Sequence, residues 1–262
     1  MSRNVLELFS LVGRRALVTG GSRGLGLQVA EALGEAGASV MLTSRNAQDL
    51  QVAVEHLRAR GIEAGFVAAD ASKPEEISRI VAATHESLGG IDILVNNAGA
   101  TWGAPAEDYP LEAYDKVMNL NVRSAFLYSQ AVARSCFIPQ RSGRILMMAS
   151  GAGLRASPPG IETVAYNTSK AALINLARAL ASEWGEHGIT VNALAPGFFP
   201  SRMTQGTLER FGTDELTRRV PLRRLGDDED LKGAAVLLAS AAGKHITGQV
   251  LSVDGGLSAI IG

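Results

Sequence analysis

Short apolar runs alternate along this chain with longer stretches in which apolar residues recur every three or four positions. The short runs are typical of buried strands, and the longer stretches are typical of helices. We predict strands at residues 15–19, 39–43, 65–69, 91–95, 144–148, 190–194 and 249–253. Because these strands are apolar along most of their length and are separated by helices, they indicate a parallel sheet covered on both faces. The predicted fold is therefore an α/β, doubly wound sheet of the Rossmann type, which binds its ligand at the carboxyl ends of the strands.

The helical stretches complete this alternation. We predict helices at 25–33, 49–60, 74–88, 111–133 and 165–184, and a pair of helices within 202–239. A chain of 262 residues with 46% hydrophobic residues can bury one large core, so residues 1–262 are expected to form a single domain. The stretch with the least strand character, 196–221, is expected to form a flap near 197–221 beside the site.

The charge balance excludes several classes of partner. With 25 basic and 26 acidic side chains the formal net charge is −1, so we expect neither nucleic acid nor an anionic membrane as a partner. The single cysteine, Cys136, excludes an internal disulfide framework, and the four histidines form no recognisable metal-binding pattern. Residues 1–11 look like neither a secretion signal nor a membrane anchor. We therefore expect a cytoplasmic protein that acts on small molecules and binds no metal.

A glycine cluster lies between the first predicted strand and the first predicted helix. Its spacing, Thr-Gly-x-x-x-Gly-x-Gly, places Gly20, Gly24 and Gly26 within residues 19–26. Backbone N–H groups and a helix N-terminus at such a position can bind a pyrophosphate. Gly20 would allow the tight turn, Gly24 the close approach of the phosphates, and Gly26 the packing of helix against strand. The cluster therefore predicts a dinucleotide site.

Further motifs follow in order along the chain. They are Asn96-Asn97-Ala98-Gly99 after the fourth predicted strand, Asn121 in the next helix, Ser150 after the fifth strand, Tyr166 and Lys170 at the start of a helix, Pro196-Gly197 after the sixth strand, and the segment from Thr247 to Gly256. Together with the glycine cluster they cover nearly the whole chain, which resembles the short-chain dehydrogenase/reductase family. The resemblance implies an NAD(P)-dependent oxidoreductase that transfers a hydride between the cofactor and a ketone/alcohol pair.

Four of these residues form the predicted catalytic group. A ketone that becomes an alkoxide needs a proton, and Tyr166 can supply it once its pKa, ~10 in water, is lowered. Lys170 lies about one helical turn later, so its ammonium would favour the tyrosinate and could also hydrogen-bond the nicotinamide ribose. Ser150 would hold the substrate oxygen, and Asn121 would fix a water that relays protons to Lys170.

The end of the second predicted strand bears on the choice of cofactor. An acidic residue there would bind the ribose 2′-hydroxyl of NAD, but the strand ends at Ser44 and Arg45 without a carboxylate. Arg45, and Arg23 in the glycine turn, could both pair with a 2′-phosphate. We therefore expect NADPH/NADP+, with NAD as the alternative. As in similar proteins, Asp70 and Ala71 would line the adenine pocket.

The full cofactor set and the substrate walls follow from the same reasoning. The predicted cofactor-binding residues are Gly20, Ser22, Arg23, Gly24, Leu25, Gly26, Ser44, Arg45, Asp70, Ala71, Asn97, Ala98, Gly99, Tyr166, Lys170, Pro196, Gly197, Phe199 and Ser201. Ser201 stands where the family often places a threonine that binds the carboxamide. Tyr166 lies 16 positions after Ser150, a few more than is usual in the family, and the added loop, 154–163, would border the substrate. The candidate apolar walls of the pocket are Trp102, Leu154, Phe198, Phe199 and Met203.

The substrate is less constrained than the chemistry. Residues 97–103 and 196–204 look most like the β-ketoacyl reductase branch of the family, which implies NADPH-dependent reduction of a 3-oxoacyl or related β-keto compound. A polyol or sugar-acid dehydrogenase on the same scaffold is the alternative, since pocket loops set the substrate. A dinucleotide sensor without turnover, or a methyltransferase, would not need Asn121, Ser150, Tyr166 and Lys170 together.

Apolar surface on one helix and at the chain end predicts a homo-oligomer. The helix at 165–184 is apolar on more than one side, which indicates a second packing partner. Residues 257–262 end the chain with further apolar side chains. Since relatives in the family usually associate through these regions, we expect a homotetramer.

Overall fold

The computed structural model describes residues 3–260, in which seven strands form one parallel sheet. In sheet order they are β3 (Ala64–Ala68), β2 (Ser39–Ser44), β1 (Arg15–Thr19), β4 (Ile93–Asn96), β5 (Gly143–Met148), β6 (Ile189–Pro196) and β7 (Val250–Val253). Leu17 of β1 pairs with Met41 of β2 on one side and with Leu94 of β4 on the other. The predicted doubly wound parallel sheet is confirmed.

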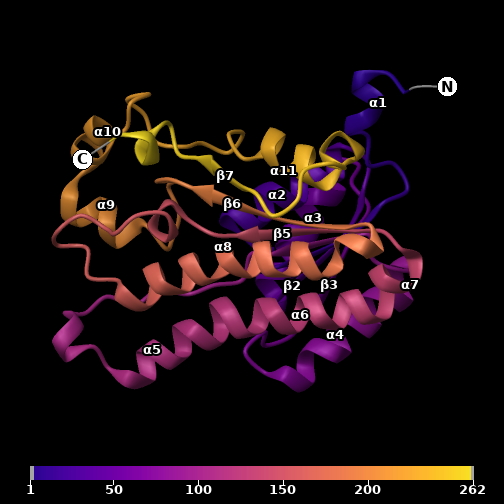
Figure 1. The fold of residues 1–262 in the computed structure, drawn as a ribbon, viewed down its shortest axis with the longest axis horizontal. Coiled ribbons are helices and arrows are strands. Elements are labelled where there is room, and N and C mark those ends of the chain that lie inside the picture. Colours follow the sequence, from indigo (N-terminus) through magenta and orange to yellow (C-terminus); the bar gives the residue numbers. More distant parts are fainter. Residues whose placement is uncertain (1–2, 261–262) are drawn as a thin grey trace.

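Helices cover both faces of the sheet (Figure 1). One layer contains α2 (Gly24–Glu35), α3 (Ala47–Arg58) and α11 (Lys232–Ala239), and the other contains α4 (Pro74–Leu88), α6 (Ser124–Val132) and α8 (Val164–Trp184). Successive strand residues point to opposite faces, so Leu17 is buried beneath the α8 layer and Val18 beneath the α2 layer. Because both faces are buried, the strands are apolar along most of their length rather than alternating.

The helix predicted at 111–133 extends further and contains two π turns. In order, it consists of α5 (Leu111–Met118), the π turn η2 (Asn119–Arg123), α6, the π turn η3 (Ala133–Phe137) and α7 (Ile138–Gln140). A π turn widens the helix locally and is frequent at functional sites. Since η2 contains Asn121, the first distortion lies at a predicted catalytic residue.

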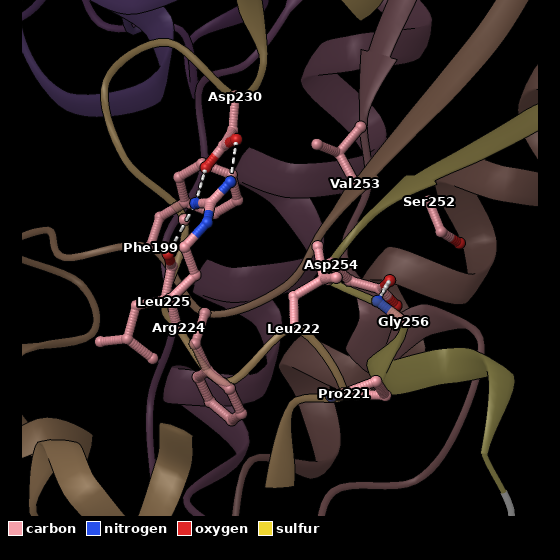
Figure 2. Close-up of a pocket in the computed structure, with 13 residues that line it drawn as sticks. Phe199, Pro221, Leu222, Arg224, Leu225, Asp230, Ser252, Val253, Asp254 and Gly256 are labelled. Atoms are coloured by element: carbon pink, nitrogen blue, oxygen red, sulfur yellow. Dashed lines mark hydrogen bonds and ion pairs between the residues drawn. The ribbon is translucent and has the colours of Figure 1, made fainter. Parts of the chain in front are cut away.

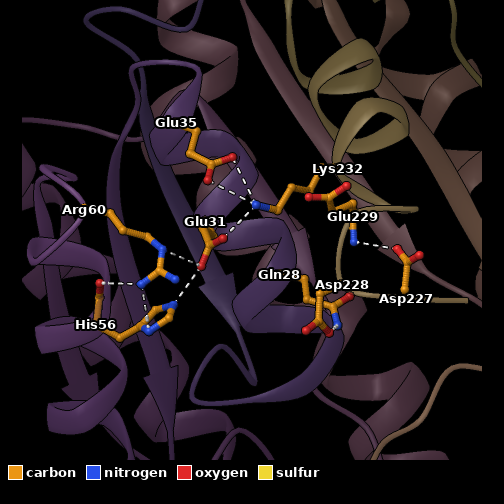
Figure 3. A network of polar contacts seen from close by, with 9 residues as sticks. All are labelled: Gln28, Glu31, Glu35, His56, Arg60, Asp227, Asp228, Glu229 and Lys232. Atoms are coloured by element: carbon orange, nitrogen blue, oxygen red, sulfur yellow. Dashed lines mark hydrogen bonds and ion pairs between the residues drawn. The ribbon is translucent and has the colours of Figure 1, made fainter.

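A network of salt bridges joins the helices of the α2 layer (Figure 3). Glu31 of α2 lies 2.6 Å from Lys232 Nζ of α11 and 2.7 Å from His56 Nε2 of α3. Beside it, Gln28 Nε2 donates to Asp228 Oδ1 at 2.7 Å. These contacts hold α11 against α2.

The connection from β6 to β7 has the opposite hand to its neighbours. The β5-to-β6 connection moves in the same direction across the sheet but carries α8 on one face, whereas α11 packs against α2 on the other face. Parallel crossovers are right-handed in ~98% of cases, so this connection is an exception. On its way from β6 to α11 the chain passes beyond the carboxyl ends of the strands, where it forms α9 (Gln205–Phe211) and α10 (Thr213–Arg219).

Two sequence-based expectations about helices were wrong or incomplete. The predicted pair of helices within 202–239 is three helices, α9, α10 and α11, because Gly212 adopts a φ of 76° and separates α9 from α10. A short helix, α1 (Val5–Phe9), was missed; its capping box is formed by Asn4 and Glu7. The remaining short helical turns are η1 (Ala106–Asp108), η4 (Gly151–Gly153), η5 (Gly185–His187), η6 (Ala241–Gly243) and η7 (Leu257–Ala259).

Two properties of residues 3–260 bear on membrane insertion and metal binding. In this range no helix combines the length and apolar character needed to cross a membrane. The same residues contain no group of three or more His, Cys, Asp or Glu side chains placed to hold a metal ion.

The contact between η4 and α8 leads to a stability prediction. A Cβ on Gly153 would lie 2.5 Å from Lys170 C and 2.7 Å from Ala171 N, which are backbone atoms of α8. Gly153→Ala is therefore expected to push η4 away from α8 and to lower the free energy of unfolding by ~1–3 kcal/mol. Urea denaturation measures the change.

Gly151→Ala is the matched control in the same turn. Its Cβ would meet Pro196 O at 3.7 Å, an ordinary contact, and the stability should stay within ~0.5 kcal/mol of wild type. Equal stabilities of the two variants would mean that η4 does not depend on the close approach of Gly153.

Candidate active site

The turn after β1 is tied to the end of β4 by a network of hydrogen bonds. Asn97 Nδ2 donates to Thr19 O and to Gly20 O, both at 3.0 Å, and Thr19 Oγ1 accepts from the backbone N–H groups of Asn97 and Ala98. A Cβ on Gly26 would overlap the Asn97 amide, and Gly20 adopts a φ of 64°. Asn97 was predicted to bind the cofactor, but the structure uses its side chain to fix the glycine turn.

The glycine turn presents the N-terminus of α2 to the sheet edge. Arg23 is the N-cap residue and makes no side-chain capping bond. The first N–H groups of α2 therefore have no capping partner within the helix and, with the helix dipole, can bind an anion. Gly24 is exposed, and a Cβ there would meet nothing within 4 Å. This geometry suits a pyrophosphate approaching the predicted residues Ser22, Gly24 and Leu25.

Ser44 and Arg45 stand together at the end of β2. Ser44 Oγ is buried and makes no hydrogen bond among the described residues, while Arg45 is exposed. Arg23 lies on the other side and forms a salt bridge with Asp49 of α3 at 3.2 Å. The edge of the sheet thus carries two arginines and an unused hydroxyl, with Asp49 as the one acidic partner of Arg23.

Asp70 and Ala71 follow β3 at the same edge. Burial acts to raise the pKa of Asp70. Hydrogen bonds from Ser72 N and Oγ, at 3.0 and 2.8 Å, and the positive charge of Arg45 lower the pKa, and together they outweigh the effect of burial. The pKa of Asp70 therefore lies below its ordinary value, and the side chain is an anion that can accept a hydrogen bond from an amine.

Ser150, Tyr166 and Lys170 come together where β5 and α8 meet. Ser150 caps η4, its Oγ accepting from Ala152 N at 3.2 Å, and its side chain lies near enough to the Tyr166 hydroxyl to act on the pKa of that group. Lys170 Nζ lies 5.4 Å from the centre of the Tyr166 ring and donates to Met148 O, the last carbonyl of β5, at 2.6 Å. The structure thus brings three of the four predicted catalytic residues into one group.

Burial shifts the pKa values of Tyr166 and Lys170 in opposite directions. Desolvation raises the pKa of Tyr166 above its ordinary value of 10.0, and the nearby Ser150 side chain only partly opposes this. Desolvation also lowers the pKa of Lys170 to about 8. The expected lowering of the Tyr166 pKa by Lys170 is therefore not found in the protein alone: removal of water from the phenol dominates, and the Lys170 ammonium donates to Met148 O.

Asn121 joins the segment after β4 to α8. Its amide donates to Ala100 O and to Ser169 Oγ, both at 2.9 Å, and accepts from Ala100 N at 2.8 Å. Ser169 Oγ in turn donates to Tyr166 O at 2.7 Å. Both amide donors of Asn121 are thus committed, and a relay water at Lys170 would need its remaining oxygen lone pair or a backbone group. Ser169 was missed by sequence reasoning, because only the fold brings it to Asn121.

The turn after β6 is organised by a residue that the sequence analysis overlooked. Thr204 Oγ1 donates to Phe199 O at 2.6 Å, accepts from Ser201 N at 2.9 Å and lies 3.0 Å from Ser201 Oγ. Phe199 is 3% exposed and its ring packs against Gly226, so this side chain is part of the protein interior. Gly197 N donates to Val253 O at 3.0 Å, which fixes Pro196 and Gly197 beside β7.

The candidate apolar walls lie at several depths. Trp102 and Met203 are 47% and 43% exposed, whereas Leu154 and Phe198 are partly buried. Loop 154–163 is linked to the segment that follows β4, since Ala104 N donates to Glu162 O at 2.9 Å. Exposed apolar side chains therefore follow the carboxyl ends of both β4 and β6.

A cavity of about 450 Å³ lies beside the flap, with Phe198 and Phe199 in its lining (Figure 2). It lies between residues 221–226 and the end of β7, and a bidentate ion pair joins Arg224 to Asp230 in its wall, with Nη2–Oδ1 at 2.7 Å. None of the predicted catalytic residues lines it.

Comparison with known proteins gives a consistent result over the whole chain. The family profile described as "Enoyl-(Acyl carrier protein) reductase" matches residues 20–258. Gluconate 5-dehydrogenase of Gluconobacter oxydans is 43% identical over 254 residues, covering 96% of this chain and 97% of that protein. The rhamnolipids biosynthesis 3-oxoacyl-(acyl carrier protein) reductase of Pseudomonas aeruginosa is 42% identical over 253 residues, covering 95% and 97%. The crystal structure of a gluconate 5-dehydrogenase from Burkholderia cenocepacia, in complex with NADP and tartrate, has a TM-score of 0.93 and 34% identity and covers 98% of this chain and 100% of that one.

The low pKa of Lys170 predicts a pH dependence of stability. Between about pH 8, the pKa in the folded protein, and 10.5, the ordinary value, the unfolded chain binds a proton that the folded protein has released. The free energy of unfolding contributed by Lys170 should therefore rise with pH in this window and be lost as the pH falls through 8. Compared with Lys170→Met, the wild type is expected to gain up to ~3 kcal/mol between these limits.

Urea denaturation of both proteins at several pH values checks this. Other titrating groups are common to both chains and cancel in the difference. A stability difference that stays constant from neutral pH to the upper limit would contradict a buried lysine with a lowered pKa.

Proposed function

This chain belongs to the short-chain dehydrogenase/reductase family, and from that premise we propose that Tyr166 is the general acid and base of an NADP(H)-dependent interconversion of a sugar-acid ketone and its secondary alcohol. As a member of the family it is an oxidoreductase that acts on CH–OH and C=O groups. The observation that carries the assignment of roles is the group formed by Ser150, Tyr166 and Lys170, held by Asn121 through Ser169. Residues 1–262 would act as one domain, with the flap near 197–221 covering the substrate.

The residues at the sheet edge fit NADP(H). The open glycine turn and the free N-terminus of α2 suit a pyrophosphate, and the unpaired buried Ser44 Oγ together with Arg45 and Arg23 suits a 2′-phosphate. Relatives of known structure support this choice, since the Burkholderia cenocepacia enzyme was solved with NADP. When bound, NADPH would supply the hydride for reduction of the ketone.

The proton chemistry follows from the positions of the side chains. Ser150 Oγ and the Tyr166 hydroxyl would both contact the substrate oxygen, so that negative charge developing there is stabilised and then protonated by Tyr166. The raised pKa keeps Tyr166 protonated at neutral pH, which is the form that reduction needs. Lys170, with a pKa of about 8, is mainly an ammonium at neutral pH and would favour the tyrosinate that remains.

Sugar acids are the substrate class that the comparisons favour. The sequence patterns pointed first to a 3-oxoacyl compound and second to a polyol or sugar acid, whereas the relative at 43% identity and the structure at a TM-score of 0.93 are gluconate 5-dehydrogenases. Arg202 and Arg210 in the flap are exposed cations, to which a carboxylate substrate would be attracted. A 3-oxoacyl substrate is the second candidate, because Trp102 and Met203 present apolar surface and a 3-oxoacyl reductase is 42% identical.

Turnover of the two substrate classes tests the proposal. With NADPH, the kcat/KM for 5-keto-D-gluconate is expected to exceed that for an acetoacetyl thioester by at least about tenfold, equivalent to ~1.4 kcal/mol. The reverse order would favour the second candidate. No consumption of NADPH over a broad ketone panel, with NADP+ binding intact, would instead favour a dinucleotide sensor.

Tyr166→Phe tests the assignment of the acid. Only the transferable proton is lost, so the Kd for NADP+ should stay within about twofold of wild type while kcat falls more than about tenfold. Fluorescence titration and steady-state rates measure the two quantities. A variant that keeps more than about a tenth of the wild-type kcat, a loss below ~1.4 kcal/mol, would remove Tyr166 from this role.

Arg45→Asp tests the choice of cofactor. A carboxylate at the end of β2 would bind the ribose 2′-hydroxyl and repel a 2′-phosphate, so the ratio of kcat/KM for NADPH to that for NADH should fall at least about tenfold. Arg134→Asp, at an exposed position on η3, is a control that makes the same charge change. If the ratio did not change, Arg23 would be the remaining candidate for the phosphate.

We also propose that the protein is a homotetramer. On α8 the exposed residues include Val164, Ala171 and Ala179, and near the chain end Leu251 and Ile260 are 37% and 42% exposed. The last two residues of the predicted contact, 261–262, lie outside the described part of the chain. Sedimentation at micromolar concentration should give about four times 27.4 kDa, and truncation after residue 256 should weaken assembly. A single 27.4 kDa species would contradict the tetramer.

A further inference from the structure

Tyr166 lies in the first turn of α8, where the helix itself provides little support. α8 begins at Val164, and the residue before it, Thr163, makes no side-chain capping bond. The first N–H groups of a helix have no partner within it, so an uncapped first turn frays easily. The exact direction of the Tyr166 side chain therefore depends on contacts from outside the helix.

Asn167, the next residue, supplies such contacts. Its amide accepts from Thr163 Oγ1 at 3.1 Å and exchanges hydrogen bonds with Ser157 Oγ at 3.0 and 3.2 Å. Exchanging the amide oxygen and nitrogen keeps both partners and adds bonds from Ser157 N and to Thr163 O, both at 3.3 Å. In either orientation Asn167 joins the first turn of α8 to loop 154–163.

The same loop also contacts three other segments of the chain. Glu162 O accepts from Ala104 N after β4, a Cβ on Gly160 would lie 3.4 Å from the Phe211 ring of α9, and Arg155 donates to Ile260 O. Among the described residues, the side-chain hydrogen bonds from loop 154–163 to α8 all end on Asn167. Asn167 therefore links the loop to the helix that carries Tyr166.

We propose that Asn167 is a positioning residue that sets the substrate-facing loop 154–163 and the Tyr166 hydroxyl in register with each other. Successive residues of a helix point about 100° apart, so Asn167 can hold the loop without entering the space above Tyr166. This inference rests on the proposed function, since it assumes that Tyr166 exchanges a proton with a substrate bordered by the loop. Under this proposal the added residues between Ser150 and Tyr166 have a role, because they hydrogen-bond the first turn of α8, which carries the acid.

The principal variant is Asn167→Ala. Small displacements of a reacting group cost large factors in rate, so kcat with the preferred ketone should fall about tenfold or more and KM should rise. The Kd for NADP+ should stay within about twofold, because the Asn167 side chain hydrogen-bonds Ser157 and Thr163, neither of which is assigned to the cofactor. Gln51→Ala, which removes an exposed amide on α3, is the control and should leave kcat and KM unchanged.

Conservative replacement and a double-mutant cycle separate positioning from general damage. Asn167→Asp still accepts from Ser157 Oγ and Thr163 Oγ1 and suits a helix N-terminus, so it should recover at least about half of the lost kcat, whereas Asn167→Leu should not. If Asn167 acts through Ser157, the losses of Asn167→Ala and Ser157→Ala should combine to less than their sum.

Three results would overturn the inference. They are wild-type kcat and KM in Asn167→Ala, full additivity with Ser157→Ala, and equal loss of activity in the aspartate and leucine variants. Failure of the proposed function itself would look different, because the wild-type protein would then turn over neither the sugar acid nor the thioester.

Discussion

The whole arrangement depends on one constraint of a parallel sheet. All of its strands end at the same edge, so the residues that follow the strands lie together at that edge. Gly20, Arg45, Asp70, Ala98, Ser150 and Gly197 are far apart in the sequence and meet because each follows a strand of this sheet. The sheet alone would leave these segments as independent loops. They become a site because side chains join neighbouring strand ends, as Asn97 does between β4 and β1 and as Asn121 does between the segment after β4 and α8.

The electrostatics of the site depend on burial more than on pairs of charges. Tyr166 and Lys170 are close, yet desolvation moves the pKa of the phenol upward and that of the amine downward, so each is shifted toward its neutral form. Such a pair changes protonation readily when an additional charge enters the pocket, because both groups lack the solvation that would hold their charged forms. A site prepared in this way responds to a charged ligand more strongly than an exposed tyrosine and lysine would.

The sequence predicted the sheet and most of the residues that meet at its edge, since buried parallel strands are apolar along most of their length and the spacing of Tyr166 and Lys170 matches one helical turn. It did not predict what depends on distant contacts. Ser169, Thr204 and Asn167 owe their hydrogen bonds to segments placed by the fold, and nothing in the local pattern distinguishes them from solvated polar residues. The direction of the Tyr166 pKa was missed for the same reason, because burial is a property of the packed protein. The hand of the β6-to-β7 connection follows from the packing of α11 on α2, which the apolar pattern of α11 alone does not specify.

That connection has a consequence for how such a protein can diversify. The chain enters β6 from α8, on one face of the sheet, and later reaches α11, on the other face. The chain between β6 and α11 must therefore cross the edge where the strands end, whatever its sequence. Both of its ends are anchored, by β6 and by the salt bridges of Lys232, so its length can vary at little cost in stability; each doubling of a flexible loop costs only ~0.6 kcal/mol. Insertions, deletions and substitutions at the exposed positions between residues 197 and 231, rather than at buried ones such as Phe199 and Leu216, would then alter the roof of the pocket while the core and the proton-transfer group stay unchanged. The unusual hand of one crossover thus separates the part of the gene that can explore new substrates from the part that must be conserved for folding and chemistry.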